Sequence, residues 1–262
     1  MAAEKYRIAA NVIPIDFGAI IPSNKKINGS FLEEISLQII RLSSLAVAIT
    51  PKPLERAVMI DDRGGQVSQS EGDEEFLRAR FYALLSTLLS RPPDAETLTM
   101  IRSLEGNDSP MGKALGTLAQ AAADTSLEEL EEEFTKLFYG VGAGGELLPY
   151  ASHYMTGLLY DKPLADLRSD LKRLGLEGNP EATEPEDCVA TELEIMHTLI
   201  LGYRGPDGEA CQQSFFKTHL LPWASNFFTD LEKAENASVY VPVGTIGLLL
   251  MEIEEQAFEM AA

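Results

Sequence analysis

Residues 183–228 read TEPEDCVATELEIMHTLILGYRGPDGEACQQSFFKTHLLPWASNFF, and this stretch decides the fold. It predicts two helices around a break that carries several glycines. In the first helix, apolar residues recur at helical spacing: Val189, Leu193, Met196 and Ile200. In the second helix, which is expected to bend at a proline, a similar stripe consists of Phe216, Leu220, Trp223, Phe227 and Leu231. The stretch therefore predicts an all-helical protein.

The first of these helices is predicted to span Pro185–Tyr203. Thr183 with Glu186 matches a capping box, and proline suits the first helical turn. The acidic cluster ahead of the apolar stripe (Glu184, Glu186, Asp187) is explained by the positive end of the helix dipole alone. Glu192 is expected to lie off the buried stripe.

Outward from this stretch, residues 73–174 predict further helices joined by short connections. Capping residues mark three helix starts, at Asp94, Ser109 and Ser126, the last with Glu129 as a capping box. Residues 175–181 form a linker at which two helical halves could hinge, and residues 241–260 are apolar enough to pack across the bundle. The expected architecture is a single helical bundle.

The first part of the chain differs in composition. Residues 1–58 hold seven Lys/Arg and five Asp/Glu, which gives a net charge of +2. Because the whole chain has a net charge of −20, residues 59–262 have a net charge of −22. A helix is predicted over 31–50, and the polar segment that follows is typical of a disordered leader. Two domains are predicted: residues 1–72 as an N-terminal extension and 73–262 as the helical domain. An alternative start at Met59 would make residues 1–58 an upstream extension or a misassigned reading frame.

Charge and motifs exclude several classes of function. The acidic balance disfavours nucleic acid and anionic membranes and favours cationic partners. No apolar run is long enough for a membrane span, and two cysteines without neighbouring ligands predict neither zinc nor any other cofactor. Residues 140–145 read GVGAGG, but a helix precedes them and Pro149 follows, so a loop is favoured over a dinucleotide site. A cytoplasmic protein without catalytic residues is expected.

Three separated segments carry a family resemblance: LFYGVG…LLPYASHY, ATEPEDCVATELEIM and FFKTHLLPWASNFFTDLEKA. In this order they resemble the TorD/DmsD/NarJ family of cytoplasmic redox-enzyme maturation chaperones, over about residues 73–262. The resemblance implies an all-α fold. It also implies binding of the twin-arginine signal peptide, or of the apo form, of a molybdenum-cofactor oxidoreductase, which delays export until the cofactor is inserted.

The resemblance also assigns a peptide-binding site. The family's E-P-x-D-H motif falls on Glu184, Pro185, Asp187 and Cys188, with cysteine where histidine is usual. The other two elements, P-x-x-S-x-Y and H-L-x-P-W, fall on residues 149–154 and 219–223. Carboxylates are expected to face the arginines and aromatic rings to line the apolar part. The full set of expected site residues is Tyr150, Tyr154, Glu184, Pro185, Asp187, Cys188, Glu192, His219, Pro222 and Trp223.

The main alternative is a helical hydrolase or nucleotide-binding enzyme that uses His219 with the Glu184 and Asp187 carboxylates. No G-x-x-x-x-G-K-[ST] loop, GxSxG elbow or HExxH motif supports it. The resemblance allows weak guanine nucleotide binding at most. A purely structural helical adaptor is a third class. The expected state is a monomer or, given the hinge at 175–181, a domain-swapped dimer.

Overall fold

The computed structural model describes residues 6–8, 69–140, 144–178, 184–202 and 208–260, and within them the fold is all-helical, as predicted. The regular β-structure of the described residues is one antiparallel pair, β1 (Tyr6–Ile8) with β2 (Leu176–Gly178), in which Tyr6 lies opposite Gly178. The sequence does not predict this pair, because residues 175–181 have the composition of a linker. The helix predicted over 31–50 and the alternative start at Met59 lie outside the described residues.

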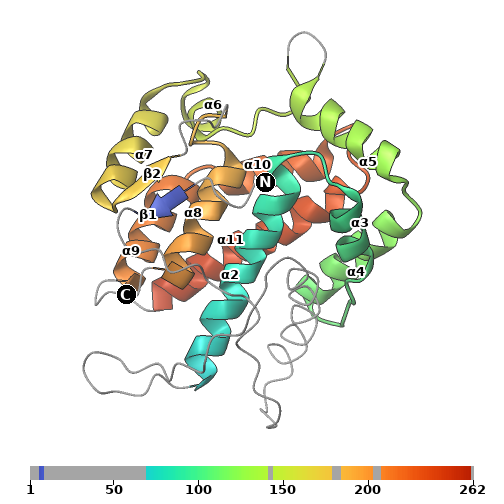
Figure 1. Cartoon of the computed structure of the whole chain (residues 1–262), viewed down its shortest axis with the longest axis horizontal. Helices are drawn as coiled ribbons and strands as arrows, with labels where there is room; N and C mark the ends of the chain where they lie inside the picture. Colours follow the sequence, from blue (N-terminus) through green and yellow to red (C-terminus); the bar gives the residue numbers. More distant parts are fainter. Residues whose placement is uncertain (1–5, 9–68, 141–143, 179–183, 203–207, 261–262) are drawn as a thin grey trace.

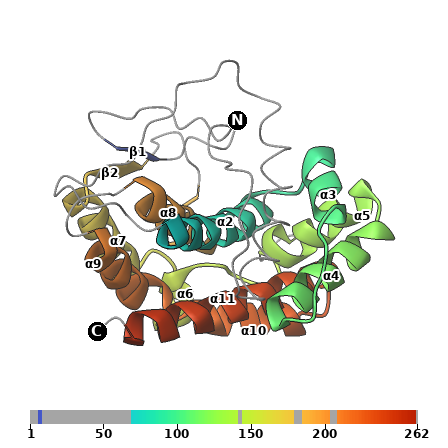
Figure 2. The same cartoon turned by 90° about the horizontal axis from the view of Figure 1, so that it is seen from below.

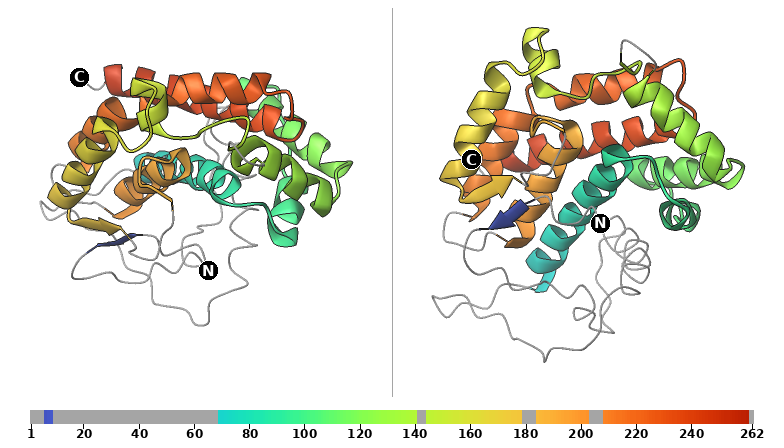
Figure 3. Two further views of the ribbon diagram at one scale, coloured as in Figure 1. Left: turned by 90° about the horizontal axis from the view of Figure 1, so that it is seen from above. Right: turned by 45° about the horizontal axis from the view of Figure 1, so that its top comes forward.

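Two pairs of helices form the centre of the molecule (Figure 1). Helix α2 (Gln69–Ser90) packs along α8 (Val189–Gly202), and α10 (Ala224–Lys233) packs along α11 (Tyr240–Met260). Figure 2 and the left view of Figure 3 show these pairs as two successive layers. One end of the layers carries α3 (Ala95–Arg102), α4 (Pro110–Ala123) and α5 (Leu127–Phe134). The other end carries α6 (Ala151–Thr156), α7 (Lys162–Arg173) and α9 (Gly208–Phe215).

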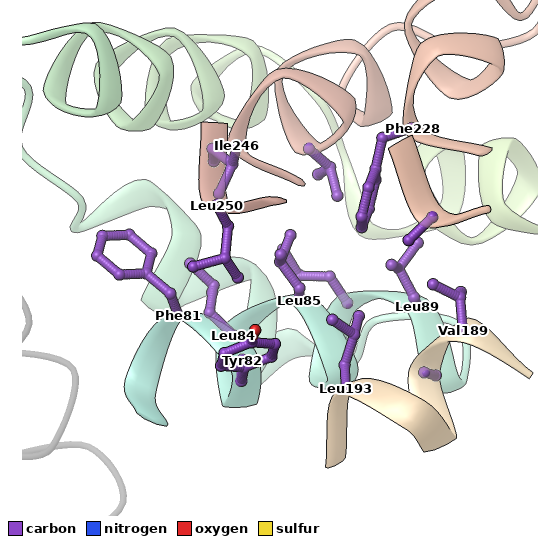
Figure 4. Packing of buried hydrophobic residues seen from close by; sticks show 14 of the residues in the cluster. Phe81, Tyr82, Leu84, Leu85, Leu89, Val189, Leu193, Phe228, Ile246 and Leu250 are labelled. Atoms are coloured by element: carbon purple, nitrogen blue, oxygen red, sulfur yellow. The ribbon is translucent and has the colours of Figure 1, made fainter. Parts of the chain in front are cut away.

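The hydrophobic core lies between the two layers. Figure 4 shows α2 and α8 side chains facing those of α10 and α11, among them Leu85, Leu193, Phe228 and Leu250. Helices α10 and α11 approach closely because Gly247 has no side chain: a Cβ there would lie 2.2 Å from Cδ1 of Phe228. The apolar stripe predicted for α8, Val189, Leu193, Met196 and Ile200, is buried throughout. Burial of these stripes on both layers is the main source of stability.

Three predicted helix starts are confirmed. The Asp94 carboxylate accepts from the backbone N–H of Thr97 at 2.9 Å, and the Ser109 hydroxyl accepts from that of Gly112 at 2.9 Å. Both halves of the capping box at Ser126 are present. These caps form from residues three apart in sequence, which is why the sequence alone predicts them.

Other helix boundaries differ from the prediction. Helix α2 begins at Gln69, four residues before the predicted domain boundary at residue 73. Two helices end in π-helical turns, η2 (Thr135–Tyr139) after α5 and η3 (Phe216–Leu220) after α9. The chain does not simply bend at Pro222: a turn over residues 221–223 separates η3 from α10, since proline has no N–H to continue the helix.

The largest correction concerns α8, which begins at Val189 and not at Pro185. Residues 187 and 188 lie ahead of the helix, and the backbone of residues 187–189 pairs with that of residues 149–151. Val189 N–H donates to the Pro149 carbonyl at 2.8 Å, and Ala151 N–H donates to the Asp187 carbonyl at 2.9 Å. The predicted cap residue Thr183 lies outside the described residues. The backbone on either side of Cys188 is therefore satisfied by a segment nearly 40 residues away in the sequence.

Candidate functional site

Two of the motif segments meet in a short antiparallel bridge between Tyr150 and Cys188. The bridge holds the residues just before α6 against those just before α8. Cys188 is buried, and its N–H donates to the Pro185 carbonyl at 3.2 Å. The bridge thus places the 184–188 segment directly beside the start of α6.

Asp187 caps α6, not the helix that follows it in sequence. Its Oδ2 accepts from the backbone N–H of Ser152 at 3.0 Å and from the Ser152 hydroxyl. The Asp187 side chain is almost completely buried, and among the described residues its Oδ1 has no hydrogen-bond partner. In this conformation Asp187 positions α6 and does not present its carboxylate to solvent.

Glu184 and Glu186 are the two carboxylates of the cluster that are not fully buried, and Glu186 pairs with Arg168 at 2.7 Å, which leaves Glu184 as the one that faces the tyrosines. It is half-buried, and its Oε2 accepts a hydrogen bond of 2.5 Å from the Tyr150 hydroxyl. Burial, followed by this hydrogen bond, raises the pKa of Tyr150. Burial also raises the pKa of Tyr139, with a further contribution from the Glu184 carboxylate. Glu184 therefore lies among tyrosines, with one oxygen held by Tyr150.

Glu192 corrects a second expectation, because it is buried and not set off the apolar stripe. Its Oε2 accepts from the Trp223 indole N–H at 3.1 Å, and the same N–H lies 2.6 Å from the His219 carbonyl. Burial raises the pKa of Glu192 well above its ordinary value of 4.5; the Trp223 hydrogen bond opposes this shift and Asp187 adds to it. The Glu192 carboxyl is tolerated in an apolar environment because the Trp223 indole donates a hydrogen bond to it.

His219 is buried and points toward α7. Its Nε2 lies 2.9 Å from Oδ2 of Asp170, and Arg173 pairs with the other oxygen of that carboxylate at 2.9 Å. Its ring lies 4.9 Å from that of Phe215. Among the described residues His219 pairs with Asp170 and not with Glu184 or Asp187, so the geometry offers no support for the alternative enzyme.

Tyr154 links the site to α10. Its hydroxyl donates to Oδ2 of Asp230 at 3.1 Å, and its ring lies 5.6 Å from that of Trp223 and 6.0 Å from that of Phe227. Burial raises the pKa of Tyr154, and Asp230 raises it further. Trp223 itself is buried in the core, whereas Pro222 is exposed beside it. The rings thus form a continuous apolar layer beneath α6.

The structure brings most of the expected site residues together around α6. Tyr150, Tyr154, Glu184, Pro185, Asp187 and Cys188 contact one another or α6 directly, and Trp223 connects Glu192 to this group through Tyr154. His219 contacts this group only through its backbone carbonyl, which accepts from the Trp223 indole. The sequence prediction missed Tyr139, Asp170 and Asp230 as partners. The sequence does point to Ser152, the partner of Asp187, because Ser152 belongs to the P-x-x-S-x-Y element. No sequence pattern points to Asp170 or Asp230, which lie 49 and 76 residues from their partners His219 and Tyr154.

The described part of the chain contains no group of three His, Cys, Asp or Glu side chains placed to hold a metal ion. None of the helices in that part is both long and apolar enough to cross a membrane.

The raised pKa of Glu192 predicts a specific pH dependence. In the folded protein the Glu192 carboxyl stays protonated at pH values where it is ionised in the unfolded chain. The contribution of this group to the free energy of unfolding is therefore fully present below about pH 4.5 and is lost as the pH rises toward the pKa of the folded state. Relative to Glu192→Gln, which keeps an acceptor for Trp223, the wild type is expected to lose up to about 1.4 kcal/mol per pH unit in this window. Urea unfolding at pH 5.5, 6.5 and 7.5 measures this difference. Glu128→Gln, which changes an exposed carboxylate, serves as the control. If the difference in the free energy of unfolding between the wild type and Glu192→Gln does not vary with pH, the prediction is wrong.

Comparisons with known proteins agree with this fold. Residues 104–229 match the family model described as nitrate reductase delta subunit. The chaperone protein TorD of Vibrio atlanticus (strain LGP32) is 29% identical over 202 residues, covering 68% of this chain and 93% of that protein. TorD of Aliivibrio fischeri (strain ATCC 700601 / ES114) is 30% identical over 173 residues, covering 57% of this chain and 80% of that protein.

A crystal structure from Archaeoglobus fulgidus, provisionally assigned as a redox enzyme maturation protein, is also similar. It has a TM-score of 0.45 and 21% identity, and the match covers 67% of this chain and 93% of that chain. This likeness is too distant to identify a function.

The fold and the TorD matches define an all-helical chaperone class. The chain belongs to the TorD/DmsD/NarJ family of redox-enzyme maturation chaperones. A family of chaperones fits the expectation that the protein is not an enzyme.

Proposed function

We propose that this protein is a cytoplasmic chaperone that binds the twin-arginine leader, or the apo form, of a molybdenum-cofactor oxidoreductase. It delays export of its client and assists cofactor insertion and proofreading. Membership of the TorD/DmsD/NarJ family supports a redox enzyme as the client. Such a client is met before export, which is why a cytoplasmic location belongs to the proposal.

The observation that carries the proposal is the position of Glu184 at the edge of an aromatic layer. One side of this carboxylate contacts Tyr150, and the layer continues through Tyr154 to Trp223. A twin-arginine leader is basic and then apolar, so its binder needs a carboxylate beside apolar surface. Guanidinium groups bind carboxylates in bidentate geometry, and the net charge of −20 attracts a cationic segment.

The buried carboxylates have a supporting role in this proposal. Asp187 holds the start of α6, and Glu192 holds the indole of Trp223. Both act as positioning residues in the conformation described, because neither side chain is accessible. Their contribution to binding is expected to be exerted through Tyr150, Tyr154 and Trp223.

Calorimetry with a synthetic twin-arginine leader tests the proposal. Glu184→Gln is expected to weaken binding about tenfold or more, the value of one charge-assisted hydrogen bond. Combining Glu184→Ala with Asp187→Ala is expected to weaken it further, with circular dichroism used to confirm folding. The exposed Glu131→Gln on α5 is the matched control, and a leader with both arginines changed to lysine is expected to bind more weakly than the original. Unchanged binding by a folded double variant contradicts the assignment.

A further inference from the structure

Exposed apolar side chains gather in one connection of the protein. Between the middle of α6 and the start of α7, Met155, Leu158, Leu159 and Tyr160 are all exposed, Leu158 at 64% and Tyr160 at 72%. Among the described residues, the other large exposed apolar side chains are Tyr139, Ile253 and Met260. Four such residues within six positions are unusual for a surface in contact with water, and clusters of this kind mark interaction sites.

The backbone holds this connection in a defined shape. Gly157 ends α6 with a φ of 77°, and Tyr160 has a φ of 59°, the left-handed region that a bulky residue rarely adopts. The Thr156 hydroxyl donates to the Ser152 carbonyl at 2.9 Å and anchors the last turn of α6. Conformations of this kind persist only where the surroundings impose them, and they concentrate at ligand-binding loops.

The exposed connection adjoins Glu184 through a row of tyrosines. Tyr150, directly ahead of α6, donates to Glu184, and the exposed connection follows the other end of this six-residue helix. Tyr139 is 48% exposed, and its pKa is raised by burial and then by the nearby Glu184 carboxylate. An accessible carboxylate therefore has exposed aromatic and aliphatic side chains on its border.

We infer that the surface formed by Tyr139, Met155, Leu158, Leu159 and Tyr160 docks the apolar residues that follow the arginine pair of a leader peptide, while Glu184 receives a guanidinium group. This inference rests on the proposed function and adds a docking surface outside the sequence motifs. Charge complementarity selects this occupant. A second copy of the chain would bring another −20 of charge to a surface beside Glu184, whereas a cationic peptide is attracted to it.

The test compares two peptides on three proteins by calorimetry. One peptide carries the arginine pair and its apolar segment, and the other has the apolar residues replaced by serine. The proteins are the wild type, Leu158→Ser with Leu159→Ser, and a control with Ile253→Ser and Met260→Ser, which changes exposed apolar residues on α11. The loop variant is expected to bind the complete leader roughly tenfold or more weakly and the serine peptide as the wild type does. The control is expected to match the wild type with both peptides.

Different failures have different meanings. If the wild type and the loop variant bind the complete leader equally, the docking surface is overturned and the proposed function stands. If the wild type binds neither peptide, the proposed function fails, and the docking surface with it. Sedimentation velocity adds a third outcome: a wild-type dimer that the loop variant dissociates would make this surface a contact between copies and overturn the inference.

Discussion

Replacing Glu133 by alanine is expected to lower the free energy of unfolding by about 3–5 kcal/mol. Glu133 lies on α5, and its buried carboxylate accepts from three successive backbone N–H groups at the start of α11: Ser238 at 2.7 Å, Val239 at 3.2 Å and Tyr240 at 2.8 Å. Alanine leaves these donors unpaired in a largely buried position. It also removes a negative charge from the positive end of a 21-residue helix.

Urea unfolding followed by circular dichroism measures this loss. Glu131→Ala on the same helix removes an exposed carboxylate and is expected to change stability by no more than about 0.5 kcal/mol. Glu133→Gln keeps one acceptor oxygen and should fall between the two. Equal stability of the Glu133→Ala and Glu131→Ala variants would show that α11 does not depend on this cap.

Replacing Trp223 by alanine is expected to cost a similar amount, about 3–5 kcal/mol. Trp223 is the only tryptophan in the sequence and is among the largest fully buried side chains of the described residues. Its removal opens a cavity between α8 and α10 and leaves the Glu192 carboxyl without its indole donor. Trp223→Phe keeps most of the volume and removes the N–H, so a smaller cost of about 1–2 kcal/mol is expected.

Circular dichroism is the suitable readout, since both variants lack the one tryptophan. Asn226→Ala, at an exposed position of α10, is the matched control and should change stability by about 0.5 kcal/mol or less. A Trp223→Ala variant that keeps wild-type stability but binds a leader peptide poorly would contradict the core position. The indole would then act on the ligand directly.

Local signals in the sequence explain the parts of the fold that were predicted correctly. Asp94, Ser109 and Ser126 each cap a helix through a backbone group three residues away, and within the described residues the structure shows no distant segment that takes over these backbone groups. The apolar stripe of α8 was likewise correct, since burial follows the helical period. The same reasoning failed at Pro185, where a capping signal competes with pairing to residues 149–151 and the long-range pairing prevails.

The sequence by itself determined that the chain forms a helical bundle, where several helices begin, and which motifs carry the family resemblance. Only the tertiary structure decided what each carboxylate does: Glu184 lies accessible among tyrosines, Asp187 caps α6, and Glu192 lies buried under Trp223. Helix periodicity and capping depend on neighbours within four residues, whereas burial and hydrogen-bond partners depend on segments brought together from 31 to 76 positions apart. Carboxylates in one short stretch therefore acquire different roles from the packing around them.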